Sequence, residues 1–292
     1  MQASLESLRQ RVASAGYIAD QELLTSLWLT TELERPLLLE GDAGVGKTEI
    51  AKVLATVLDC ALIRLQCYEG LDVNTAVYEW NYQRQLLAIR HQEAQSEKNV
   101  SEDALFSDKY LLKRPLLQSI SEPQSVVLII DEIDRADEEF EAYLLELLSD
   151  FQVSIPEIGT IKAQSIPKVI LTSNGTRELS DALRRRCLYH YIGYPDYDKE
   201  LSIVMSKVPE AGAQLASQIV NFVQRLRQQD LRKIPGIAET LDWAAALLRF
   251  DIKSLEDDPD AIVATLGCLL KTQEDQESMP KDMVERLIAK AV

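Results

Sequence analysis

The chain has 292 residues, which is enough for one core domain and a smaller second domain. With 46% hydrophobic residues and a net charge of −16, its composition excludes a disordered chain and disfavours a nucleic-acid binder, because such proteins usually present a basic face. No run approaches 18 consecutive apolar residues and the first residues lack the apolar centre of a signal peptide, so we expect a soluble cytoplasmic protein without membrane insertion.

Up to about residue 194 the sequence predicts a parallel sheet covered by helices. Two helices are predicted from apolar residues three or four positions apart, one over residues 50–58 and one over 140–151, with Tyr143 on its apolar stripe. Short apolar runs predict five strands, at residues 37–39, 61–65, 126–130, 169–172 and 188–192.

Strand signals end at Tyr197, and helical spacing continues to Val292. One stripe runs from Leu215 to Leu226 and another joins Ile262, Leu266, Leu269 and Leu270. We therefore predict an α/β domain at residues 1–194 and an all-helical domain at 195–292. An insertion at about 69–115 contains a polar segment, residues 93–103, which predicts an exposed loop, and residues 153–163 predict a hairpin.

Cysteine and histidine content argues against metal or nucleophilic chemistry based on these residues. Cys60, Cys67, Cys187 and Cys268 are widely spaced without a Cys-x-x-Cys pair, which is typical of buried free thiols in a reducing compartment. Two histidines give poor support to a histidine metal site or a Ser-His pair.

The strongest motif lies between the first predicted strand and the first predicted helix. The motif predicts a loop that binds the phosphates of a nucleotide. Its glycines let backbone amides turn toward phosphate oxygens. Lys47 supplies a positive charge for the β- and γ-phosphates, and the Thr48 hydroxyl ligates magnesium. Glu49 follows in the helix. An ordinary glycine turn before a helix is the alternative. The matched pattern is GxxxxGK[ST], formed by Gly41, Asp42, Ala43, Gly44, Val45, Gly46, Lys47 and Thr48.

Two carboxylates end the predicted strand at residues 126–130. A buried parallel strand places its acidic tip at the carboxyl edge of the sheet, where ligands bind in open α/β folds. Asp131 is the candidate for the magnesium shell, and Glu132 is the candidate base that orients and deprotonates the attacking water. A solvated acidic helix cap is the alternative, because more acidic residues follow.

These motifs together resemble a known family. The chain resembles the AAA+ ATPases, and their MoxR branch in particular, in the glycine-rich loop, in VVLIIDEIDRADEEFEAYLLELLSDF and in VILTSNGTRELSDALRRRC. It is similar to the CoxD-like subgroup in LIRLQCYEGLD, YEWNYQRQLL, IPEIGTIKAQSIPKVILTSN and IPGIAETLDW. The resemblance covers essentially the whole chain and implies a P-loop NTPase core of parallel strands with a C-terminal all-α lid, ATP and Mg²⁺ as ligands, and ATP hydrolysis.

The resemblance also implies roles for polar residues beyond the two motifs. Asn174 matches the sensor-1 residue that helps to place the lytic water, although Asn174-Gly175 is also a good turn dipeptide. A short helix beginning at Leu179 ends in three arginines, of which Arg186, or alternatively Arg185, corresponds to the finger that reaches a neighbouring subunit's nucleotide. A solvated basic helix end is the alternative.

The insertion and the hairpin correspond to family elements at the axial surface of a ring, so both are candidates for touching a partner. A hairpin that serves packing alone is the alternative. One departure concerns the sensor-2 arginine of the lid: Ala238 or a neighbour stands where the arginine is expected, and Arg232 or Lys233 are possible substitutes.

The resemblance implies a homo-oligomeric ring, a hexamer, that remodels or matures a protein client with a von Willebrand A-domain partner. A molybdenum hydroxylase such as carbon monoxide dehydrogenase is the implied client, and a Rubisco-activating ATPase is an alternative within the family. A nucleotide-gated binding switch with little hydrolysis is an alternative from another class. The acidic charge and the lack of a recognisable nucleic-acid domain disfavour a DNA motor.

Overall fold

The computed structural model describes residues 2–94 and 102–292, and these fall into two compact units that do not follow chain order. The first unit comprises the described residues of Met1–Leu8, Gln21–Glu40 and Ala51–His190. The second comprises Arg9–Asp20, Gly41–Ile50 and Tyr191–Val292. The glycine-rich loop therefore clusters with the helical half of the chain, although it follows a strand of the first unit.

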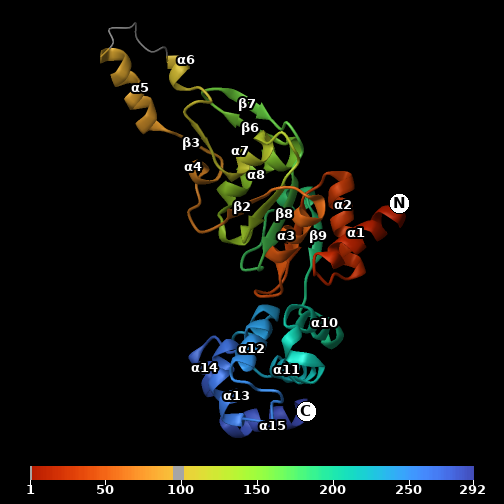
Figure 1. Ribbon diagram of the computed structural model, residues 1–292. Coiled ribbons are helices and arrows are strands. Elements are labelled where there is room, and N and C mark those ends of the chain that lie inside the picture. Colours follow the sequence, from red (N-terminus) through yellow and green to blue (C-terminus); the bar gives the residue numbers. More distant parts are fainter. Residues whose placement is uncertain (1, 95–101) are drawn as a thin grey trace. The chain divides into compact units, whose positions relative to one another are not determined.

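A five-stranded sheet, in the order β2-β5-β8-β1-β9, forms the centre of the first unit (Figure 1). The pairs β2–β5, β5–β8 and β8–β1 are parallel. Each strand matches a predicted one to within one residue at either end, so the predicted α/β class with a parallel sheet is confirmed. The strands are β1 (Leu37–Glu40), β2 (Leu62–Gln66), β5 (Val127–Asp131), β8 (Lys168–Ser173) and β9 (Leu188–Tyr191).

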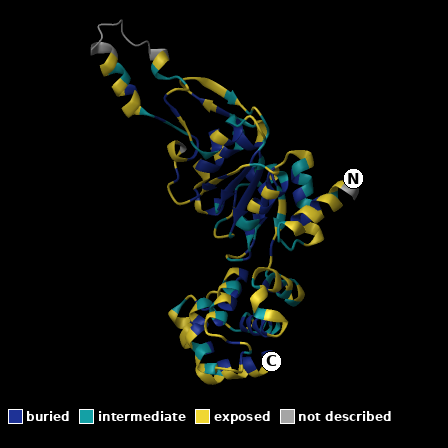
Figure 2. Cartoon of the chain, in the orientation of Figure 1, coloured by how far each residue is buried: buried dark blue, intermediate teal, exposed yellow. Residues whose placement is uncertain are grey.

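Helices of the first unit pack against this sheet, and α7 contacts β2 and β5 while α2 contacts β1 and β8. Strand β5 is buried along its whole length because it lies between β2 and β8 and is covered by helices (Figure 2). The helices in this part of the chain are α1 (Gln2–Ser14), α2 (Gln21–Leu33), α3 (Lys47–Leu58), α7 (Pro115–Ser121), α8 (Glu138–Asp150) and α9 (Asp181–Arg186), with a 3-10 turn at Ile133–Arg135.

A helix was predicted at residues 140–151 and α8 lies at Glu138–Asp150, but two residues of the predicted stripe differ from the prediction. The first turn of α8 is capped by the Asp137 carboxylate, which accepts a hydrogen bond from the Phe140 amide. Tyr143, expected on the buried stripe, is 56% exposed because position 143 lies one residue before the inward-facing Leu144. Phe151 lies beyond the helix in a left-handed conformation, with φ 47°, and ends it.

The helix α9 begins two residues later than predicted. The Ser180 hydroxyl accepts a hydrogen bond from the Leu183 amide and so caps the helix, which leaves Leu179 outside it.

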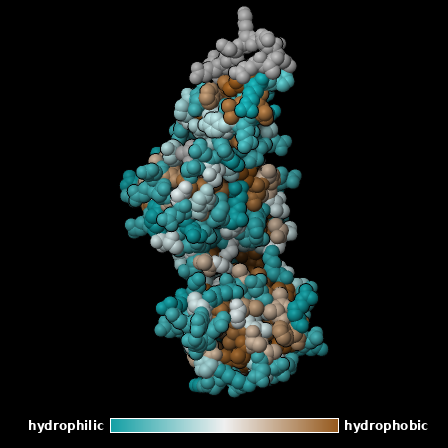
Figure 3. Space-filling view, turned by 90° about the vertical axis from the view of Figure 1, so that its left-hand side faces the viewer, coloured by the Kyte–Doolittle hydropathy of each residue, from teal (hydrophilic) through white to brown (hydrophobic). Residues whose placement is uncertain are grey.

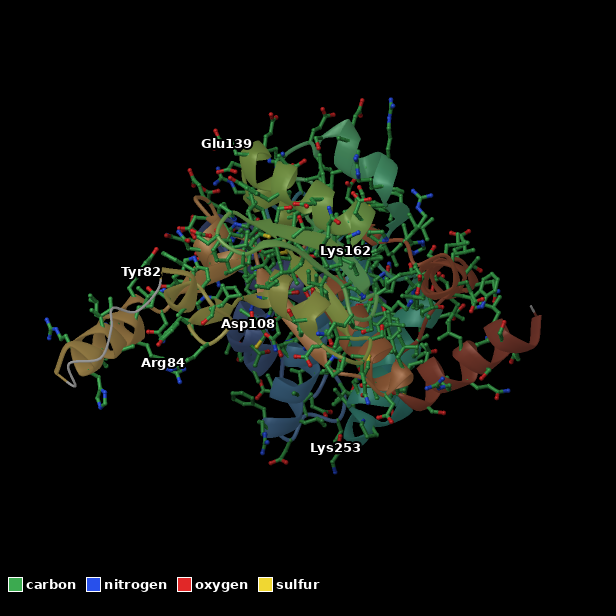
Figure 4. All side chains as sticks on the ribbon, turned by 90° about the horizontal axis from the view of Figure 1, so that it is seen from above. Tyr82, Arg84, Asp108, Glu139, Lys162 and Lys253 are labelled. Carbon is green, nitrogen blue, oxygen red and sulfur yellow. The ribbon has the colours of Figure 1, made fainter. Side chains whose placement is uncertain are left out.

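The insertion at residues 69–115 forms a small structure of its own. Strands β3 (Tyr78–Trp80) and β4 (Leu111–Lys113) pair antiparallel, and α4 (Val73–Ala76), α5 (Tyr82–Ala94) and α6 (Glu102–Leu105) complete it. Helix α5 projects from the sheet, with Tyr82 and Arg84 near its beginning (Figures 1 and 4). Most of the predicted loop at 93–103 lies outside the described residues.

The predicted hairpin at residues 153–163 is confirmed. Strands β6 (Gln152–Ile155) and β7 (Gly159–Lys162) pair antiparallel, with Ile155 opposite Gly159. Ile158 in its turn is 36% exposed.

From Tyr191 onward the second unit is helical, without a described strand after β9. The predicted stripe from Leu215 to Leu226 is buried on α11, where Phe222 packs on Trp243 with ring centroids 4.9 Å apart. The second predicted stripe is not one helix: Leu269 and Leu270 are buried but lie beyond the turn that ends at Cys268. The helices are α10 (Tyr197–Lys207), α11 (Gly212–Leu226), α12 (Ile237–Arg249), α13 (Pro259–Thr265), α14 (Gln273–Glu277) and α15 (Lys281–Ala291), with 3-10 turns at Pro209–Ala211 and Leu266–Cys268.

Among the described residues, no helix is both long and apolar enough to span a membrane. Hydrophilic side chains cover most of the face shown in Figure 3, with smaller hydrophobic areas between them. All four cysteines are free, as predicted, but only Cys67 and Cys187 are fully buried; Cys60 and Cys268 are half-buried.

Candidate functional site

The glycine-rich loop connects β1 to α3, as the motif predicts, and helix α3 begins at Lys47. Gly44 and Gly46 adopt left-handed backbone conformations, with φ of 79° and 96°, which residues with a side chain rarely adopt. The Lys47 ammonium donates hydrogen bonds to the carbonyl oxygens of Gly41 and Asp42, both at 2.7 Å. The loop thus holds a buried positive charge at the N-terminus of a helix, an arrangement suited to phosphate.

The neighbouring loop and helix residues complete this segment. Asp42 and Ala43 are exposed, Val45 is buried, and Thr48 and Glu49 are half-buried in the first turn of α3. Burial, followed by the charges of Asp20 and Glu49, raises the pKa of Tyr17 far above its ordinary value, so the phenol stays protonated.

The acidic end of β5 is more constrained than the sequence indicated. Asp131 is 3% exposed, and its two oxygens have different partners. Oδ1 accepts a hydrogen bond from the Thr172 hydroxyl at 2.6 Å, and Oδ2 accepts one from Arg64 Nη2, also at 2.6 Å. Arg64 comes from the adjacent strand β2. Asp131 is therefore held by both strands that flank β5.

Glu132 has an unusual backbone. Its φ of 55° and ψ of 51° place it in the left-handed region, where a non-glycine residue is uncommon. The Glu132 amide donates to the Thr172 hydroxyl at 2.9 Å, and the carboxylate forms an ion pair with Arg135 at 3.1 Å. The Thr172 hydroxyl thus links both acidic residues, because it accepts a hydrogen bond from the Glu132 amide and donates one to the Asp131 carboxylate.

Asn174 follows the last residue of β8, as expected, and is half-buried. The loop that carries it is anchored by Asp134, which is 3% exposed and accepts hydrogen bonds from the Thr176 amide at 3.0 Å and the Thr176 hydroxyl at 2.6 Å. Burial alone raises the pKa of Asp134, but hydrogen bonds from Thr176 and the Asn174 backbone outweigh it and lower the pKa below its ordinary value. Asp134 therefore holds the Asn174 loop as a carboxylate at neutral pH.

The sheet brings the polar strand ends together. Strand β8 lies between β5 and β1, and the pairs are parallel, so Asp131, Ser173 and Glu40 end their strands at the same edge. Asn174 continues the chain from Ser173, and Gly41 continues it from Glu40.

The three arginines at the end of α9 contact the rest of the chain to different degrees. Arg184 forms an ion pair with Glu40 at 3.2 Å. Arg186 donates to the Ser149 hydroxyl and, at 2.9 Å, to the Ala182 carbonyl. Arg185 is exposed, and no hydrogen bond or ion pair engages its side chain within the described part of the chain.

Thr172, Arg64, Arg135 and Asp134 were not singled out from the sequence. Thr172 carried one signal, because it is a polar residue at the end of the predicted strand, directly after three apolar residues. The other contacts join segments 3 to 67 positions apart and have no motif of their own.

The two predicted magnesium ligands carry oxygen donors, which suit a hard divalent cation rather than zinc. In residues 2–94 and 102–292, no group of three or more His, Cys, Asp or Glu side chains is arranged to hold a metal ion. Thr48 and Asp131 offer oxygen donors, and Mg²⁺ is typically held by one or two such groups together with phosphates and water. Burial and then the nearby carboxylates raise the pKa of Cys67 to about 12, which keeps this thiol neutral.

Comparisons with known proteins agree with this fold. Residues 36–187, more than half of the chain, match the family model described as AAA domain (dynein-related subfamily). An uncharacterized protein of Staphylococcus aureus (strain USA300) is 26% identical over 256 residues, which are 85% of this chain and 89% of that protein. An uncharacterized protein of Staphylococcus epidermidis (strain ATCC 35984) is 24% identical over 269 residues, 89% of this chain and 94% of that protein.

A solved structure of a RuvB mutant from Thermotoga maritima is also similar. Its TM-score is 0.51 at 17% identity, and the match covers 89% of this chain and 73% of that chain. At this identity the likeness concerns the fold alone.

Proposed function

We propose that this chain, which belongs to the AAA domain family in its dynein-related subfamily, is a magnesium-dependent ATPase that converts ATP and water to ADP and phosphate. The observation that carries the proposal is the glycine-rich loop with its buried Lys47 ammonium, set after β1, together with the Asp131–Glu132 pair that ends β5 at the same sheet edge.

Each site residue has a part in this proposal. The amides of the loop and the Lys47 ammonium bind the phosphates, and Thr48 and Asp131 hold magnesium. When bound, the ion neutralises charge on the phosphate oxygens. Glu132 accepts a proton from the attacking water, and the Asn174 side chain orients that water.

The chain's further role rests on the family resemblance. We propose a MoxR-type, CoxD-like ring, a hexamer, that remodels or matures a protein client, such as a molybdenum hydroxylase, with a von Willebrand A-domain partner. Helix α5 supports a client-binding role for the insertion, because it buries the polar Gln85 and leaves Leu86 and Leu87 56% and 66% exposed.

A nucleotide-gated switch with little hydrolysis is the second candidate. The observation that favours it is the ion pair between Glu132 and Arg135, which holds the proposed base on a neighbouring cation. If this pair persists when nucleotide binds, the carboxylate is a poorer base and binding alone controls the partner.

Two variants test the hydrolase. We expect Lys47→Ala to lose ATP binding, and Glu132→Gln to bind ATP but turn over at least about 100-fold more slowly, the scale of lost base catalysis. Radiolabelled ATP turnover and equilibrium binding measure the two effects separately. Undiminished turnover in Lys47→Ala would overturn the ATPase, whereas wild-type turnover as slow as that of Glu132→Gln would favour the switch.

A further inference from the structure

The glycine-rich loop contacts the backbone of two segments of the helical part of the chain, at Ile192 and at Gly236. A Cβ atom added to Gly41 would lie 2.1 Å from the Ile192 carbonyl oxygen, so this glycine touches the segment that leads out of β9. A Cβ atom on Gly236 would lie 2.7 Å from both the carbonyl carbon and oxygen of Gly44. Two peptide backbones thus meet at Gly44 and Gly236, beside the Glu239 carboxylate, which accepts a hydrogen bond from the Gly236 amide at 3.0 Å.

Hydrogen bonds join the same two backbones. Gly236 is the residue before α12, and the first two amides of that helix, from Ile237 and Ala238, donate to the Gly44 carbonyl at 3.1 and 3.4 Å. These amides have no partner within a helix, because the first turn lacks preceding carbonyls. The Gly44 carbonyl therefore caps α12 from outside, and its own orientation is fixed by the helix.

A buried network holds the turn that carries Gly236. Arg227, whose side chain is 7% exposed, forms a two-point ion pair with the fully buried Glu200, at 2.6 and 2.7 Å. Its Nε donates to the Pro235 carbonyl at 2.8 Å, and the Thr240 hydroxyl donates to the Gly236 carbonyl at 3.1 Å. Because these groups are buried and hydrogen-bonded to one another, they fix the Pro235–Gly236 turn to helices α10, α11 and α12.

We infer that Gly236 and the first amides of α12 are positioning groups for nucleotide binding, which set the shape of the phosphate loop through the Gly44 carbonyl. This inference rests on the proposed function. The resemblance leads one to expect an arginine near position 238, yet Ala238 contributes only its backbone amide here. Loop shape and the position of α12 are thereby linked, so a ligand that binds the loop more tightly in this shape than in others also stabilises the contact.

Gly236→Ala tests the contact directly, and Gly267→Ala is its control, because a Cβ on Gly267 meets its nearest atom at 3.9 Å. The probe is a fluorescent, non-hydrolysable ATP analogue with magnesium, read by titration and by melting temperature with and without the analogue. We expect Gly236→Ala to lower affinity at least about tenfold, as the loop amides lose their alignment. The rise in melting temperature on adding analogue should shrink in parallel, while Gly267→Ala matches wild type in both.

A second pair covers the case in which Gly236→Ala does not fold. Ile237→Pro removes the nearer amide at a helix position that favours proline, after an extended residue compatible with it. Ile237→Ala keeps the amide while losing side-chain bulk. We expect Ile237→Pro to bind the analogue about three- to tenfold more weakly than Ile237→Ala, the scale of a lost hydrogen bond.

Lys47→Ala separates this inference from the proposed function. If Lys47→Ala abolishes binding while Gly236→Ala or Ile237→Pro binds as tightly as its control, the inference is overturned and the ATPase stands. If Lys47→Ala binds the analogue normally, the proposed nucleotide site itself is wrong.

Discussion

Glu132 occupies a backbone conformation that costs a non-glycine residue on the order of 1–3 kcal/mol, and such residues persist only where their surroundings hold them. The hold comes from Thr172, whose hydroxyl accepts from the Glu132 amide and donates to Asp131. A single hydroxyl on β8 thus holds the backbone of the proposed base and, together with Arg64, the side chain of the proposed magnesium ligand. This makes Thr172 the residue on which the geometry of the acidic pair depends.

Replacing that hydroxyl should affect turnover more than binding. Thr172→Val keeps the shape but removes the hydrogen bond that the hydroxyl donates to Asp131 and the one that it accepts from the Glu132 amide, so we expect turnover to fall about tenfold or more. Nucleotide affinity should change less than about threefold, because the loop amides are untouched. Thr172→Ser, which restores the hydroxyl, should recover most of the turnover. Equal loss in the valine and serine variants would indicate a packing role instead.

Among single residues, the sequence predicted those that belong to a local motif. It did not predict contacts that form only because two strands are neighbours in the sheet. Lys47 and the loop glycines are adjacent in the chain, so their pattern was sufficient to predict a phosphate-binding loop. Arg64 meets Asp131 only because β2 pairs with β5, a pairing that no spacing of 67 positions reveals. The left-handed backbone of Glu132 was likewise invisible, because glutamate carries no preference for it.

Among elements, short apolar runs predicted every strand of the central sheet. The inner strands β1, β5 and β8 are buried on both faces and are largely apolar, whereas exposure alternates along the edge strands β2 and β9. Helices were predicted less completely where capping decided their limits, as at Ser180, or where a turn interrupted the stripe, as after Cys268. Apolar spacing predicts burial but does not require one continuous helix, so Leu269 and Leu270 reach the core from outside α13 and the turn that follows it.

Helix α5 departs from ordinary amphipathic packing and carries a prediction at the element scale. Changing Leu86 and Leu87 together to serine should leave basal ATP turnover within about twofold, because the helix projects from the sheet. Recovery of a client on Glu132→Gln protein held in ATP should fall about tenfold, as expected when two exposed anchors of an interface are lost.

The control for this prediction is Leu33→Ser, since Leu33 is 54% exposed but lies on α2, away from the insertion. Quantitative mass spectrometry of the captured proteins compares the variants. Unchanged recovery with the serine pair would place client contact elsewhere in the molecule.

For the whole molecule, the site groups come from strands β5, β8 and β1, which are neighbours in space but not in sequence. The family match covers these strands and ends at residue 187, just after the arginine cluster. Arg184 and Arg186 are bound within their own subunit, whereas the exposed Arg185 side chain is available to another. In the ring that we propose, an arginine of one copy would complete the site of the next, which would give this cluster a function.

Mixing two inactive variants tests that arrangement. Lys47→Ala subunits retain their arginines but cannot bind ATP, and subunits with Arg185→Ala and Arg186→Ala bind ATP but lack the proposed finger. In random rings about a quarter of the interfaces pair an intact loop with intact arginines, so we expect roughly that fraction of wild-type turnover. The single arginine variants then show which residue is needed, and Arg286→Ala, at an arginine exposed on α15, controls for lost surface charge. If the mixture stays inactive although the variants co-assemble, the arginines act within their own subunit and the shared site is wrong.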